Sequence, residues 1–229
     1  MEILEEIPFE LDLDTLLSQL HISKDSDDAT EVGDLAGAVT PLIKPKAAYQ
    51  VSYIEGRGDD TVNIGGVVFT SRVLRVNLDG VERVFPYIAT CGREADEAPL
   101  PSDDMMAPFW LDTIKGMALG AAGEALRDHL SRTYAVGRMS SMNPGAGPHD
   151  LWPIEQQSQL FSLLGDVEGR IGVRLTDSFL MIPNKTVSGI YFPTEITFEA
   201  CKLCPREVCQ GRRAPYDEAL SKSYNVAST

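Results

Sequence analysis

The chain has 229 residues, of which 43% are hydrophobic, and a formal net charge of -14 at pH 7. This length and hydrophobic content allow a substantial core in one domain. The acidic balance argues against nucleic acid as a partner, because phosphate contacts require clustered Lys and Arg. The N-terminal sequence MEILEEIPFELDLD is acidic without an apolar core segment, and no window approaches the length of a membrane span. We therefore expect a cytoplasmic protein with no membrane partner.

The N-terminal part, residues 1–47, is predicted to be mainly helical. Residues 10–20 place Leu at helical spacing, with acids on the other face. The polar segment 24–33 predicts a loop, and residues 35–42 predict a second helix that stops near Pro45.

Strands are predicted next. Residues 48–54 and 62–69 carry β-branched and aromatic residues in partial alternation. Residues 71–78 predict a short helix. A further strand is expected over 83–90, ending before Cys91.

A long helix is predicted over residues 110–134, after an acidic and Pro-rich loop at 93–108. Its expected buried side consists of Leu111, Ile114, Ala118, Ala121, Ala125 and His129. Its glycines weaken helix propensity but let a neighbouring element pack closely. A later helix is expected to start at Pro153 and to stop at Gly165.

The last predicted strands form a hairpin. It joins residues 178–182 to residues 187–192 around the turn Pro183-Asn184-Lys185. Hairpin-linked strands and helices in runs favour an α+β fold with an antiparallel sheet over a βαβ array. We predict one domain over residues 1–216 and a flexible polar tail at 217–229.

Three of the four cysteines, Cys201, Cys204 and Cys209, lie within the sequence CKLCPREVC. Thiolates at this spacing can converge on zinc or an iron–sulfur cluster. The alternative is a set of reduced cysteines without a ligand. A fourth thiolate is absent nearby, and Cys91 could supply it only if the fold brings it close.

The segment between Gly137 and Phe192 carries the features of a small-molecule site. Arg138 could bind a carboxylate with two hydrogen bonds. The loop 143–147 could offer backbone amides, and Tyr191 could lie against a ribose, an adenine or a cationic sulfonium. Each feature also has a structural alternative: a surface ion pair, a connecting loop, or packing within the hairpin. No Walker loop, Gly-x-Gly-x-x-Gly or Gly-x-Ser-x-Gly motif occurs.

The order of these features, with LLGDVEGRIGVRLTDSF and then VSGIYF, resembles the activation domain of cobalamin-dependent methionine synthase. The resemblance covers about residues 137–192 and extends more loosely over 48–134. As a whole, the chain resembles free-standing activation-domain-like proteins of corrinoid methyltransferase systems, which often end in a cysteine cluster. The resemblance implies a C-shaped α+β domain that binds S-adenosylmethionine. It also implies reductive remethylation of a corrinoid held by a partner methyltransferase or corrinoid protein, with an external electron donor.

The resemblance also implies ligand-binding residues. Arg138 matches the arginine that opens the family's R-x-x-x-G-Y motif, Gly145 its glycine, and Tyr191 the tyrosine of a Ser-Gly-Trp-Tyr-Phe strand. Pro144 belongs to the same loop. Glu124 aligns with an acid that contacts the ligand.

The motif itself is altered in this chain. The interval from Arg138 to Gly145 is three residues longer than the motif, and Ala146 stands where the motif has tyrosine. An ungapped alignment on the glycine would place Ser141 at the arginine position. Two other functions therefore stay open: a metal-binding redox accessory protein of a corrinoid system, and an interaction module that keeps the fold without the ligand.

Overall fold

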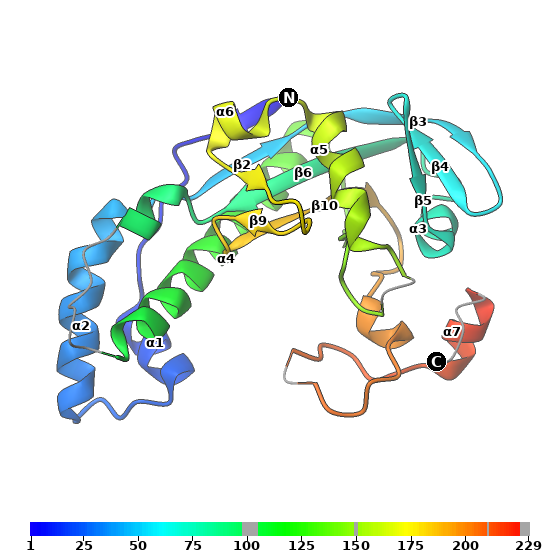
Figure 1. Ribbon diagram of the computed structural model, residues 1–229. Helices are drawn as coiled ribbons and strands as arrows, with labels where there is room; N and C mark the ends of the chain where they lie inside the picture. The colour runs from blue at the N-terminus through cyan, green and yellow to red at the C-terminus, as the bar shows by residue number, and fades with distance from the viewer. Residues whose placement is uncertain (98–104, 149–150, 210, 225–229) are drawn as a thin grey trace.

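The computed structural model describes residues 1–97, 105–148, 151–209 and 211–224. Its elements form an arch (Figure 1), in which an antiparallel sheet spans the top. From one end of the sheet hang α1 (Leu13–Leu20), α2 (Asp27–Val39) and the first half of α4 (Ala107–Tyr134). The chain from η4 (Ala200–Leu203) to α7 (Glu218–Ser223) hangs from the other end. The fold is α+β, as the sequence predicts.

Eight strands of the described chain form the main sheet, and β6 (Arg83–Thr90) lies at its centre. One edge of β6 pairs first with β3 (Ser52–Arg57) and then with β2 (Lys46–Tyr49), while β10 (Thr186–Pro193) pairs along the other edge. The remaining strands of this sheet are β1 (Glu2–Leu4), β4 (Thr61–Ile64), β5 (Val67–Thr70) and β7 (Met139–Met142). A separate pair consists of β8 (Arg174–Leu175) and β9 (Met181–Ile182).

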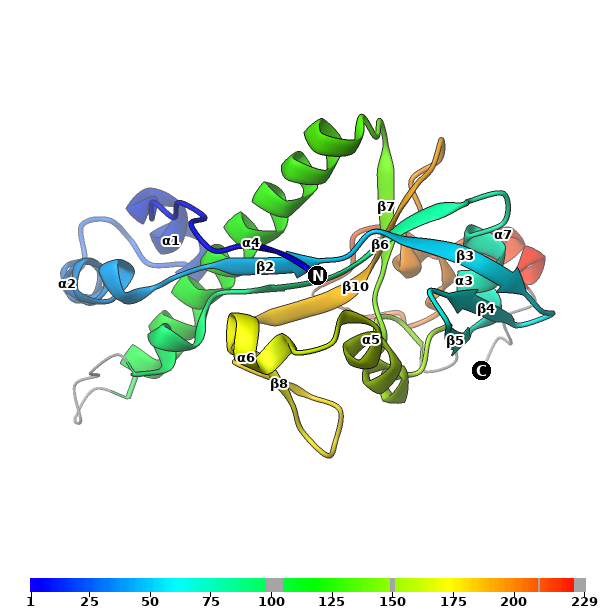
Figure 2. The same cartoon turned by 90° about the horizontal axis from the view of Figure 1, so that it is seen from above.

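Helices cover both faces of the central strands. Since side chains alternate between the two faces of a strand, neighbouring residues of one strand pack against different helices. In β6, Phe85 and Tyr87 pack with α4 residues such as Leu126. Val84 and Ile88 pack on the opposite face, in the cluster that holds α5 (Gln157–Leu164) and α6 (Val167–Ile171). Figure 2 shows α4 and α5 on opposite sides of β10. The described elements not yet named are α3 (Arg72–Asn77), η1 (Thr40–Leu42), η2 (Arg93–Glu97) and η3 (Ile154–Gln156).

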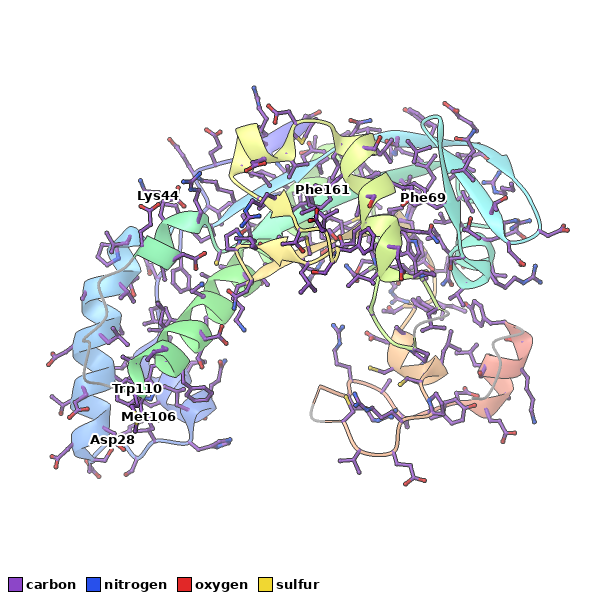
Figure 3. The ribbon with its side chains drawn as sticks, in the orientation of Figure 1. Asp28, Lys44, Phe69, Met106, Trp110 and Phe161 are labelled. Atoms are coloured by element: carbon purple, nitrogen blue, oxygen red, sulfur yellow. The ribbon has the colours of Figure 1, made fainter. Side chains whose placement is uncertain are left out.

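Large aromatic side chains mark two of the three core clusters in Figure 3. Trp110 belongs to the cluster in which α1, α2 and the start of α4 pack together. Phe69 belongs to the cluster under α5, and the partly buried Phe161 packs against it. No helix of the described residues is both long and apolar enough to cross a membrane.

The predicted loop at residues 24–33 is wrong from residue 27 onward, and the predicted helix at 35–42 starts too late. Ser26 caps α2 by accepting a hydrogen bond from the Ala29 N–H, and Asp27 and Asp28 occupy its first turn. Acids at a helix N-terminus are stabilised by the helix dipole, so this acidic run begins a helix.

The predicted hairpin of residues 178–182 with residues 187–192 is also wrong. Strand β9 pairs with β8, whereas β10 pairs with β6 on one edge and β7 on the other. The short strand β9 therefore belongs to a separate two-stranded sheet with β8, and it does not pair with β10.

The buried side of α4 differs from the predicted one beyond Ala118. The structure buries Ala122, Leu126 and Leu130, whereas the predicted Ala121, Ala125 and His129 are only partly buried. Beyond Ala118 the buried stripe continues in steps of four residues, whereas the prediction takes a step of three to Ala121 and so moves about 100° around the helix, onto the neighbouring face.

The segment from residue 217, predicted as a flexible tail, contains α7. Asp217 caps this helix by accepting from the Leu220 N–H, and Ser221 is buried. The Tyr224 hydroxyl donates to Asn77 Oδ1 at 2.7 Å, which ties the segment to the C-terminal end of α3. Residues 225–229 lie outside the described residues.

Candidate functional site

A cleft of about 600 Å³ lies between α4, β7, β10 and the chain around η4. Residues on successive turns of α4, namely Gly120, Gly123 and Arg127, form one wall. The facing wall consists of β7 and the backbone from 197 to 200. The two walls come from segments that are separated in the chain, so the tertiary fold creates this cleft.

The floor of the cleft is aromatic. Tyr191 on β10 is 8% exposed, and its ring stacks on Tyr87 of β6 with centroids 4.2 Å apart and an interplanar angle of 22°. Burial raises the pKa of the Tyr87 phenol above its ordinary value, so this hydroxyl stays neutral. The floor thus presents an uncharged aromatic surface to a ligand.

Asn143 joins the loop after β7 to this floor. Its Nδ2 donates to the Tyr87 hydroxyl at 2.9 Å and to the Ser188 carbonyl at 2.6 Å. Gly189 allows this approach, because a Cβ there would lie 2.5 Å from Asn143 Nδ2 and would collide with the Met142 carbonyl oxygen. The loop is therefore fixed to β6 and β10 before any ligand arrives.

The backbone amides of the Pro/Gly loop are already used within the protein. The Gly145 N–H donates to the Trp152 carbonyl at 2.8 Å, and the Ala146 N–H donates to the Asn143 carbonyl at 3.1 Å. Gly145 has a φ of +78°, where a side chain would be strained. Gly145 thus shapes the loop, and the amides of Gly145 and Ala146 are not free to bind a ligand.

The structure brings only part of the predicted ligand site together. Ala146 and Tyr191 line the cleft. Pro144 and Gly145 lie in the adjoining loop without lining it. Glu124 is exposed and lines a different surface hollow, beside Phe9 and Asp12.

Arg138 also lies outside the cleft. It borders another surface hollow together with Arg83, and its Nη1 donates to the Glu195 carbonyl at 2.5 Å. Ser141, by contrast, lines the cleft, as the ungapped alignment on the glycine would require. The longer interval between Arg138 and Gly145 therefore coincides with an arginine that lies outside the cleft.

Sequence reasoning missed two cations, Arg127 and Arg213, that line the cleft. For Arg127 a signal existed, because Gly120, Gly123 and Arg127 recur at the spacing of one helix face. Arg213 carried no such signal, since 86 positions separate it from Arg127 and only the fold joins them.

The cysteine segment is organised by a guanidinium group. Arg212 donates to the carbonyls of Cys201 and Cys204, each at 3.4 Å, to that of Ala214 at 3.2 Å and to that of Arg206. Cys201 and Cys204 are half-buried, and Cys209 is exposed. Four carbonyls from separate positions thus converge on one cation.

These cysteines do not form a metal site as they stand. Within the described ranges no group of three or more His, Cys, Asp and Glu side chains could hold a metal ion. Cys91 is buried in the core cluster of α1, α2 and α4, and burial raises its pKa to about 11. The present arrangement thus does not fit zinc or an iron–sulfur cluster, and metal binding stays a prediction. His149, which follows the Pro/Gly loop in the sequence, lies outside the described residues.

Comparisons with known proteins concern the sequence and the fold. Residues 131–202 match the family model of the vitamin B12 dependent methionine synthase activation domain. Among solved structures, the fold is similar to the MetH reactivation domain bound to AdoHcy, with a TM-score of 0.54 and 15% sequence identity over 87% of this chain and 81% of that chain. No curated protein matches the chain. The predicted resemblance and fold are confirmed.

Proposed function

We propose that this protein binds S-adenosylmethionine in the cleft and assists the reductive remethylation of a corrinoid held by a partner protein. The observation that carries the proposal is the Tyr87–Tyr191 floor. Most of the residues that line the cleft around this floor belong to the segment 131–202, which matches the activation-domain model. The similar solved domain binds AdoHcy, the product of methyl donation from this ligand.

The cleft residues would bind and orient the ligand. The exposed part of Tyr191 suits an adenine face or a sulfonium, and Ala146 leaves room where the family motif has a tyrosine. Asn143 holds Tyr87 and the loop in register, as a positioning residue. The neutral Tyr87 adds no charge that would repel the ligand.

Methyl donation requires little chemistry from the protein itself. The sulfonium supplies an electrophilic methyl group: its C–S bond breaks with the electron pair left on sulfur, and a reduced corrinoid cobalt provides the pair for the new bond. One electron from an external donor is needed first to reduce the inactive corrinoid. The protein contributes placement of the two reactants, which is a large part of catalysis in bimolecular reactions.

One domain over residues 1–216 is part of the proposal. The core clusters on the two faces of the sheet share β2, β6 and β10, because neighbouring residues such as Ala47 and Ala48 belong to different clusters. The two clusters therefore depend on the same strands, and neither cluster could form as a separate domain.

Calorimetry of the purified chain tests the proposed function. S-adenosylmethionine and S-adenosylhomocysteine are expected to bind with sub-millimolar dissociation constants, about -4 kcal/mol or better. ATP, which carries adenosine without the amino-acid group, serves as the control and should bind more weakly. Absence of heat with either adenosyl ligand at millimolar concentration would contradict the proposal.

A further inference from the structure

The charge of the cleft differs in sign from that of the chain. The chain carries 34 acidic and 20 basic residues, yet the described residues that line the cleft include Arg127, Arg213 and a single acid, Glu199. Two guanidinium groups over an aromatic floor favour a ligand with an anionic group at one end and a flat ring at the other.

Both guanidinium groups are available to a ligand. Arg127 is exposed on α4, and its side chain has no hydrogen bond or ion pair with any described residue. Gly120 and Gly123 precede it on the same wall of the cleft and leave the helix surface bare there. A long cationic side chain beside bare backbone can extend over a bound ligand.

Arg213 is held in place through its backbone. Its N–H donates to Cys201 Sγ at 3.4 Å, and the preceding residue, Arg212, fastens the segment by its four carbonyl contacts. The Arg213 guanidinium itself has no partner among the described residues. The cysteine segment thus positions a free cation at the edge of the cleft.

We infer that Arg127 and Arg213 recognise the carboxylate of the ligand's amino-acid group, in place of Arg138. This inference rests on the proposed binding of S-adenosylmethionine. Arg138 is unsuited to the task because it borders another hollow and bonds to the Glu195 carbonyl. Arg127 and Arg213 both lie outside the segment 131–202 that matches the family model, so the resemblance does not assign them.

A comparison of ligands with and without the carboxylate tests the inference by calorimetry. We would measure S-adenosylmethionine, decarboxylated S-adenosylmethionine and 5′-methylthioadenosine against the wild-type chain and the variants Arg127→Gln and Arg213→Gln. Each substitution should weaken S-adenosylmethionine about tenfold, the effect of one charge-assisted hydrogen-bond pair. The two ligands without a carboxylate should lose less than about twofold, well below the tenfold step that one such pair supplies.

Two further variants make the result decisive. Arg132→Gln removes a charge from the same helix outside the cleft and should leave all affinities unchanged. Arg127→Lys keeps the charge without the planar fork and should recover part of the affinity. Melting temperatures equal to wild type would show that the variants fold.

The possible failures are distinguishable. If Arg138→Gln weakens S-adenosylmethionine while the Arg127 and Arg213 variants do not, the inference is overturned and the proposed function stands. The same holds if the Arg127 and Arg213 variants weaken all three ligands equally. If the wild-type chain binds none of the three ligands, the proposed function fails and this inference fails with it.

Discussion

Tyr87 and Tyr191 come from neighbouring strands, β6 and β10, and their rings stack with centroids 4.2 Å apart. The stack is diagonal, since Tyr87 lies opposite Gly189 in the register and Tyr191 lies opposite Phe85. Gly189 has no side chain, so the Tyr191 ring can extend toward Tyr87. The aromatic floor of the cleft therefore depends on a glycine in the strand.

Replacing Tyr191 tests the aromatic floor. Tyr191→Ala is expected to weaken S-adenosylmethionine binding about tenfold, because stacking of a base on an aromatic side chain contributes about 1–3 kcal/mol. Tyr191→Phe keeps the ring and should bind nearly as well as wild type. Calorimetry measures both, with Tyr53→Ala as the control because Tyr53 is 59% exposed and lies outside the cleft. Equal losses in the Tyr53 and Tyr191 variants would contradict this role.

Gly189→Ala should destabilise the fold by about 1–3 kcal/mol, the usual range for an overpacked site. The added methyl group would collide with the Met142 carbonyl oxygen and displace the Asn143 amide from Tyr87 and Ser188. Urea denaturation followed by circular dichroism measures the free energy of unfolding.

Gly37→Ala is the matched control for Gly189→Ala. Gly37 is exposed within α2, and a Cβ there would meet no atom within 4 Å. Alanine has the higher helix propensity, so this variant should gain about 0.5–1 kcal/mol. A Gly189→Ala protein as stable as wild type would show that β7 and β10 do not approach as closely as described.

Arg212→Gln should loosen the cysteine segment, because four carbonyls lose their shared donor. In a Cys209→Ser background, Cys201 and Cys204 should then react several-fold faster with a thiol reagent, while the buried Cys91 stays slow. Its pKa of about 11 keeps the Cys91 thiol protonated at pH 8. Mass spectrometry of the labelled protein distinguishes the sites.

Arg206→Gln serves as the control for Arg212→Gln, because Arg206 contributes its backbone carbonyl and its exposed side chain makes none of these contacts. A bound metal would give the opposite pattern: a chelator would accelerate labelling of Cys201 and Cys204, and the Arg212 variant would behave as wild type.

The ion pair of Lys46 with Glu94 predicts a pH dependence of stability. Burial raises the pKa of Glu94, but the hydrogen bond from Lys46 Nζ at 2.7 Å, a backbone hydrogen bond and the charges of Lys46 and Lys44 together lower it by more, so the net pKa lies below its ordinary value of 4.5. A carboxyl with a depressed pKa in the folded state stabilises the fold above its ordinary pKa and loses that contribution as the pH falls through the folded pKa.

Glu94→Gln tests this contribution by urea denaturation between pH 7 and pH 3. The variant should be less stable than wild type at pH 7 by up to about 1 kcal/mol, a small effect because the pair is partly exposed. The difference should shrink as the pH falls below 4.5 and through the lower pKa of folded Glu94, where the wild-type carboxylate becomes protonated. Glu97→Gln is the control, since Glu97 lies on the same turn with its carboxylate 3.9 Å from Arg93. A difference independent of pH would contradict the assignment.

Local sequence patterns predict those helices and strands whose position depends on interactions within a short segment. The strand at 83–90 and the long helix were predicted with bounds close to those of β6 and α4. The polar run at residues 24–33 predicts a loop by its composition, although acids and Ser suit both loops and helix N-termini. Ser26 resolves the ambiguity only through its cap geometry.

The amino-acid sequence by itself determined the α+β class and the resemblance that spans residues 137–192, because strand alternation, helix periodicity and turn residues are properties of short segments. It determined neither the pairing of β9 with β8 nor the cations of the cleft. Arg138 lies within the recognisable motif but borders another hollow, while Arg127 and Arg213 lie far apart in the chain and line the same cleft. Which guanidinium can reach a ligand in the cleft depends on how α4 and the chain after β10 lie relative to the sheet, and only the tertiary structure decides that.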